Sequence, residues 1–114
     1  MKEQLRKSTE NMHTRVAEMK QIFVRTSEEK PDFYKDVKPY VDKLQAEADE
    51  WRTLGLQWIK ETRPQYVHPL NIEDAHENIM NLALQAFFHD VKEKRFMEMA
   101  EAITYTLSGV QSEM

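Results

Sequence analysis

Residues 38–62 read KPYVDKLQAEADEWRTLGLQWIKET, and this stretch decides the fold. Its apolar and small residues recur at alternating steps of four and three, which is the spacing of the buried seam of a helix in a bundle. With one residue upstream, the seam is Val37, Val41, Leu44, Ala48, Trp51, Gly55 and Trp58. Arg63-Pro64 stops the pattern, because the residue before a proline disfavours helical geometry. We therefore predict a long helix over 38–62.

The start of this helix is less sharply marked than its end. Pro39 suits the first turn of a helix but damages an interior. Phe33 and Val37 keep the helical phase upstream of Pro39, so that a short lead-in helix or a kink is expected there. The pattern leaves open whether the helix begins before or after Pro39.

Three further stretches show helical periodicity, over 2–25, 71–88 and 94–111. Their seams are Leu5, Thr9, Met12, Val16, Met19 and Phe23; then Ile72, Ala75, Ile79, Leu82, Ala83 and Ala86; then Phe96, Ala100, Ile103, Leu107 and Val110. Asn71 is a candidate N-cap, and Leu70 before it is placed to pack on Ala75 as a hydrophobic staple. Four amphipathic helices joined by short links predict an all-α antiparallel four-helix bundle, forming one domain over residues 1–114.

Composition narrows the classes of function. The chain has 114 residues, with 20 acidic and 16 basic side chains, so its net charge of −4 argues against a nucleic-acid partner. It has no cysteine, which excludes a disulfide scaffold and a thiolate metal site, and its two glycines cannot form a Gly-rich phosphate loop. No apolar run is long enough for a membrane helix and no signal sequence is evident, so the cytoplasm is the expected location.

The second half of the chain resembles a known family. The segments 58–68 (WIKETRPQYVH), 82–87 (LALQAF), 94–96 (KRF) and 105–107 (YTL) are similar to the YppE-like family of small uncharacterised proteins of Bacillus and its relatives, a domain of unknown function. The resemblance covers residues 58–113 and extends over residues 1–50 only in helix pattern and length. It implies a four-helix bundle and brings no catalytic or binding residues with it.

Two Glu-x-x-His motifs suggest a metal site at first sight. Glu10 with His13, and Glu73 with His76, have the spacing found in di-iron carboxylate bundles. The helical phase opposes this interpretation, because Glu10 falls opposite the seam of its helix. We therefore expect no metal and no cofactor, and solvated acids beside one partly buried, hydrogen-bonded histidine at position 76. A small-ligand or metal site near His76 or His68 is the alternative hypothesis.

A second polar group lies in the stiff link between two prolines, at residues 64 and 69. Arg63, Tyr66 and His68 could together bind a small anion or transfer a proton. The structural interpretation is that Arg63 bonds the last carbonyls of its helix, Tyr66 plugs the bundle end and His68 caps or bridges. The sequence favours the structural role, and no nucleophilic triad is readable, so we lean away from an enzyme.

The predicted helix over 71–88 carries more apolar residues than one seam needs. Met80, Leu84 and Phe88 form a second row at steps of four, turned by a quarter to a third of a circle from the core face. Such a row is either clamped between neighbouring helices or offered to a partner. We expect it to stay partly accessible and to contact a partner protein or a second copy. The most fitting function is therefore a non-catalytic protein–protein interaction module.

Overall fold

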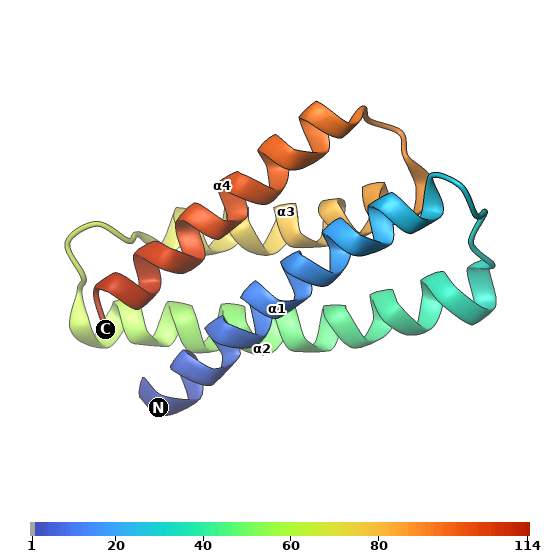
Figure 1. The fold of residues 1–114 in the computed structure, drawn as a ribbon. Helices are drawn as coiled ribbons and strands as arrows, with labels where there is room; N and C mark the ends of the chain where they lie inside the picture. Colours follow the sequence, from blue (N-terminus) through green and yellow to red (C-terminus); the bar gives the residue numbers. More distant parts are fainter. Residues whose placement is uncertain (1) are drawn as a thin grey trace.

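The computed structural model describes residues 2–114 and consists of helices joined by short links. The elements are α1 (Lys2–Thr26), the π-helical segment η1 (Phe33–Val37), α2 (Lys38–Thr62), α3 (Pro69–Phe88) and α4 (Glu93–Ser112). Successive helices run in opposite directions, so that the predicted all-α antiparallel bundle is confirmed (Figure 1). The helix ends differ from the predicted ranges by two residues at most. Within residues 2–114, no helix is long and apolar enough to cross a membrane.

The predicted seams line the core. Trp51 is fully buried and Trp58 is almost so, while Val41 packs on the core from its edge. At Gly55 α2 packs tightly against α3, since a Cβ atom added to it would lie 3.1 Å from Cδ1 of Ile72. The small residue therefore admits the neighbouring helix while the two tryptophans fill the space beside it.

One hydrogen bond inside the core joins α1 to α2. Thr9 is the buried polar side chain of α1, and its hydroxyl donates to the carbonyl of Leu5 at 2.8 Å. The same oxygen accepts from the indole Nε1 of Trp51 at 3.0 Å. Both polar groups are thus satisfied, which is the condition for burying them without a large free-energy cost.

The start of α3 differs from the prediction. The helix begins at Pro69 with His68 as its N-cap residue, and Asn71 is the third helical residue. The side chain of Asn71 accepts from the backbone N–H of His68 at 2.7 Å. Because the helix starts earlier, Leu70 is already in helical phase, opposite Ile79 and the core. Leu70 is accordingly 67% exposed, and the predicted staple with Ala75 is wrong.

Asn71→Ala is expected to lower the free energy of unfolding by about 1 kcal/mol, because it removes the acceptor of one hydrogen bond at the helix start. Urea denaturation followed by circular dichroism measures this change. Asn81→Ala serves as the control, since Asn81 is exposed in the middle of the same helix. An equal loss in both variants would contradict the capping role.

The lead-in to α2 is π-helical. Asp32 precedes it and its carboxylate accepts from the backbone N–H of Lys35 at 2.9 Å, while the N–H of Val37 donates to the carbonyl of Asp32 at 3.2 Å. The backbone N–H of Asp32 in turn donates to Oδ2 of Asp36 at 2.9 Å. α2 then starts directly at Lys38, with Pro39 in its first turn, where a missing N–H costs nothing.

Candidate functional site

The second apolar row of α3 reaches the surface near the C-terminal end of the helix. Leu84 is 42% exposed and Phe88 is 47% exposed, whereas Met80 packs partly on the core. The exposed positions 77, 81, 84 and 88 follow one another at helical spacing. Leu84 and Phe88 therefore belong to the exposed face of α3, on which the earlier positions 77 and 81 are polar, whereas Met80 lies at the edge of the core.

Leu84 forms one wall of a groove against η1 and the start of α2. The groove has a volume of about 420 Å³, and its apolar lining is Phe33, Tyr34, Val37, Val41 and Leu84. Phe33 and Tyr34 stand edge to face with ring centroids 5.2 Å apart, and they are 51% and 77% exposed. An ion pair at 2.7 Å between Lys38 and Asp42 lies at its edge.

Phe88 borders a second hollow at the same end of the bundle. This hollow has a volume of about 440 Å³ and lies between the end of α3 and the link that leaves α1. Its lining is Thr26, Ser27, Glu28, Lys30, Pro31, Phe87, Phe88 and His89. We call Phe33, Tyr34, Leu84 and Phe88 the apolar patch. The apolar patch lies at the end of the bundle that holds η1 and the C-terminal ends of α1 and α3 (Figure 1). Both chain termini lie toward the opposite end.

The helix ends beneath the patch are firmly held. His89 ends α3 in the left-handed conformation, with φ of 55°, and its ring stacks on Phe23 at 4.1 Å. Phe23 stacks on Phe96 at 4.1 Å from the other side. The Thr26 hydroxyl oxygen lies within hydrogen-bond distance of the carbonyl of Ala86, at 2.6 Å, and of Nε2 of His89, at 2.7 Å. The patch therefore rests on a stack that ties α1, α3 and α4 together.

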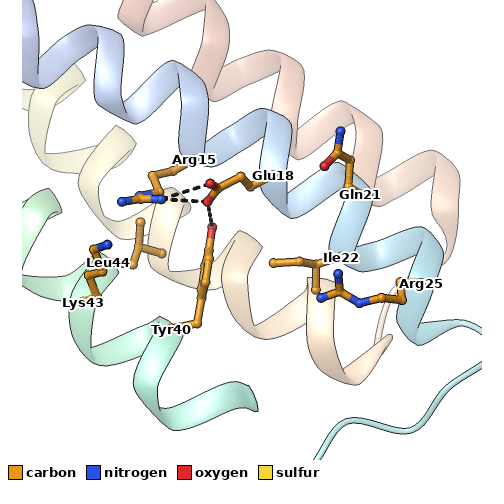
Figure 2. A pocket seen from close by; sticks show the side chains of 8 residues that line it. All are labelled: Arg15, Glu18, Gln21, Ile22, Arg25, Tyr40, Lys43 and Leu44. Carbon is orange, nitrogen blue, oxygen red and sulfur yellow. Dashed lines mark hydrogen bonds and ion pairs between the residues drawn. The ribbon is translucent and has the colours of Figure 1, made fainter. Parts of the chain in front are cut away.

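A polar pocket of about 380 Å³ lies between α1 and α2, and Figure 2 shows its side chains. The guanidinium of Arg15 donates to both carboxylate oxygens of Glu47, at 2.7 and 2.8 Å, and to Glu18 at 2.9 Å. The Tyr40 hydroxyl donates to the same Glu18 at 3.0 Å. This cluster joins the two helices by charge-assisted hydrogen bonds.

The pKa values of this cluster follow from its contacts. The hydrogen bonds from Arg15 lower the pKa of Glu47, and the bond to Glu47 raises the pKa of Arg15. Burial, followed by the hydrogen bond to Glu18, raises the pKa of the Tyr40 phenol. Arg15 and Glu47 are charged at neutral pH and Tyr40 is protonated, so these three groups hold the helices together instead of exchanging a proton.

The two Glu-x-x-His motifs point to separate partners. Glu10 is exposed, and Nε2 of His13 lies 3.1 Å from Oε1 of Gln111. Glu73 forms a bidentate ion pair with Arg52, which lowers the pKa of Glu73, and one of its bonds measures 2.8 Å.

His76 is the partly buried, hydrogen-bonded histidine of α3. Its Nε2 lies 2.7 Å from Oδ1 of Asp49 on α2, and this contact lowers the pKa of the Asp49 carboxyl. Across residues 2–114, no three or more His, Asp or Glu side chains are grouped so as to hold a metal ion.

The polar group of the α2–α3 link is spread over its surface. Arg63 is the C-cap residue of α2 and has the left-handed conformation, with φ of 48°. Its backbone N–H donates to the carbonyl of Ile59. His68 occupies the N-cap position of α3. Tyr66 is 74% exposed, so its predicted role as a plug is wrong. Val67 is the buried residue of this link instead, and it packs beside Gly109 of α4.

The link is also fastened to the end of α4. The backbone N–H groups of Gln65 and Tyr66 each donate to the carboxylate of Glu113, at 2.8 Å. Among the hydrogen bonds within residues 2–114, none joins the side chains of Arg63, Tyr66 and His68 to one another. Hydrogen bonding within this part of the chain therefore does not hold the three side chains together.

Comparison with known proteins identifies relatives along nearly the whole chain. Residues 2–114 match the family described as a bacterial domain of unknown function, DUF1798. The Bacillus subtilis protein named uncharacterized protein YppE is 37% identical over 83 residues, which are 73% of this chain and 68% of that protein.

Solved structures agree with this match. The crystal structure of Bacillus subtilis YppE superposes with a TM-score of 0.92 at 30% identity, covering 99% of this chain and 94% of that one. A crystal structure of a protein of unknown function from Listeria innocua has a TM-score of 0.89 at 29% identity, covering 97% of this chain and 90% of that one.

Proposed function

The chain belongs to the bacterial DUF1798 family, and we propose that it is a non-catalytic protein–protein interaction module. The observation that carries the proposal is the apolar patch, in which Phe33, Tyr34, Leu84 and Phe88 are exposed at one end of the bundle. Phe33, Tyr34 and Leu84 line one groove and Phe88 lies one helical turn beyond Leu84, and exposed apolar groups of this kind are typical of docking sites on folded proteins.

The patch is not needed to complete the core. The core face of α3 is already filled by residues that are fully or almost fully buried, among them Ile79, Leu82 and Ala86. Leu84 and Phe88 lie outside this face and border two open hollows. Polar side chains at these two positions would leave the core intact, and the apolar ones are available for a contact with another protein.

Leu84→Asp is expected to abolish partner binding while it changes the melting temperature by only a few degrees, because Leu84 is largely outside the core. Two measurements test this: thermal unfolding, and quantitative mass spectrometry of the cytosolic proteins retained by the immobilised chain. Retention of a specific partner should fall at least tenfold.

Leu82→Asp is the matched control, since Leu82 is two residues away and fully buried. A charge there has no partner and should unfold the domain. If Leu84→Asp also unfolds the protein, or if it retains the same proteins as the wild type, the interaction surface is not where we place it.

A further inference from the structure

The polar pocket between α1 and α2 contains an arginine that the helix-joining cluster does not use. Arg25 lines this pocket together with Arg15. The other arginines of α1 are paired, since Arg6 bonds Glu3 and Arg15 bonds Glu47. Among the ion pairs that residues 2–114 form, none includes Arg25. Its guanidinium is therefore available to a group from outside the chain.

The placement of Arg25 favours an anion in the pocket. Figure 2 shows the side chain lying beside Ile22, with the guanidinium on the side of Tyr40. Glu29 and Asp36 line a smaller cleft that Arg25 also borders, but neither forms an ion pair with it. A guanidinium that leaves these carboxylates unpaired keeps its planar set of donors for a ligand carboxylate, which it can bind through two parallel hydrogen bonds.

The walls of the pocket add apolar surface beside this cation. Ile22 and Leu44 line it and are buried in the core, and the ring of Tyr40 is fixed by the hydrogen bond from its hydroxyl to Glu18 at 3.0 Å. The volume of about 380 Å³ lies within the range of ~300–1,000 Å³ that is typical of small-molecule sites.

Independently of the proposed function, we infer that this pocket binds a small organic acid. The carboxylate of the ligand pairs with Arg25, and its apolar body lies against Ile22 and Tyr40. Inorganic phosphate or sulfate has no apolar body, so it would leave these walls in contact with water.

The charges around the pocket favour a ligand with a single negative charge. The lining carries three cations and one carboxylate, and the carboxylate of Glu47 lies behind Arg15, so the excess is one positive charge. One carboxylate neutralises this excess. A phosphate monoester carries about 1.5–2 negative charges at neutral pH and would exceed it next to Glu18.

Titration of the isotope-labelled full chain with sodium hexanoate, followed by heteronuclear NMR, tests the inference with a defined probe. We expect saturable shifts of the backbone signals of Ile22, Arg25, Tyr40 and Leu44. Hexanol and hexylamine carry the same apolar body without a negative charge, and they should bind about tenfold more weakly or less, because they lose the charge-assisted bond. Hexyl phosphate should bind no more tightly than hexanoate.

Arg25→Gln should weaken the binding of hexanoate by about tenfold or more, since it removes the charge that pairs with the carboxylate. Arg25 is exposed, so the melting temperature should stay the same. Arg95→Gln is the matched control, because it removes the same charge from an exposed position of α4 outside the pocket. This variant should bind hexanoate as the wild type does.

Other outcomes overturn the inference. Absence of saturable binding, or equal binding by Arg25→Gln, would show that Arg25 does not receive a carboxylate. Equal binding of hexanol, or shifts centred on Phe33 and Leu84, would mean that apolar contact alone holds the probe. Tighter binding of hexyl phosphate would make a phosphate ester the ligand. None of these results bears on the proposed function, which depends on protein retention by Leu84.

Discussion

Replacing Trp51 by alanine is expected to lower the free energy of unfolding by about 3–5 kcal/mol. Trp51 is the largest of the fully buried side chains, and its removal leaves a cavity in the middle of α2 that neighbouring residues fill only in part. It also removes the indole N–H that donates to Thr9 at 3.0 Å. Urea denaturation followed by far-ultraviolet circular dichroism measures the loss.

Two further variants separate the causes. Tyr105→Ala removes an aromatic side chain that is 81% exposed, so its effect should stay within about 0.5 kcal/mol. Thr9→Val keeps the volume but leaves the indole N–H without an acceptor, which should cost about 1–3 kcal/mol. A loss below ~1 kcal/mol for Trp51→Ala would mean that the packing around Trp51 is not the structural centre of the bundle.

Arg15→Met is expected to cost about 2–4 kcal/mol at pH 7, because it leaves two carboxylates close together without their cation. The Arg15 side chain is only 15% exposed and that of Glu47 is 23% exposed, so solvent screens this pair less than a surface pair. The double variant with Glu47→Met should recover part of the loss, since it removes the carboxylate that would otherwise stay half-buried and unpaired.

The same contact predicts how stability depends on pH. Because Arg15 lowers the pKa of Glu47, the stabilisation from this carboxylate is complete above its unfolded pKa of ~4.3 and is lost as the pH falls through the lower folded value. The difference in unfolding free energy between pH 7 and pH 3 should therefore be smaller in Arg15→Met than in the wild type. An unchanged difference would show that the pair does not couple folding to protonation.

The helices and the core could be predicted from sequence because their signals are local. Apolar residues at alternating steps of four and three fall on one face of a helix, and this spacing alone predicts the burial of Trp51 and Trp58. The start of α3 was missed because two signals competed. Pro69 is typical of the first residue of a helix, and Asn71 is typical of an N-cap, so the sequence allows a start at either position. In the structure the helix begins at Pro69.

The candidate site was accessible to sequence analysis only in part. The row of Met80, Leu84 and Phe88 was readable as an excess of apolar residues on one helix, although Met80 packs more on the core than the other two. Phe33 was readable as part of a short lead-in helix, but its position beside Leu84, and that of Tyr34, depends on the π-helical turn, which sequence periodicity does not reveal.

The polar cluster between α1 and α2 needed the structure for a different reason. Arg15 and Glu47 are 32 residues apart in the chain. Both side chains look like ordinary solvated charges in the sequence, and their contact depends on which faces of α1 and α2 meet. For the apolar patch, by contrast, the sequence carries a local signal, because two adjacent aromatic residues, Phe33 and Tyr34, lie between Pro31 and Pro39.

The π-helical form of residues 33–37 also gives a way to follow this surface through evolution. A π turn holds one more residue than an α turn, so a deletion of a single residue from the segment would be absorbed by converting it to an α turn. That conversion would rotate Phe33 and Tyr34 by about 100° relative to α2 and take them away from Leu84. In related chains, the length of this segment is therefore a marker that can be counted in an alignment. Lineages with a one-residue gap there should have lost the aromatic wall and, with it, selection for an apolar residue at the position of Leu84.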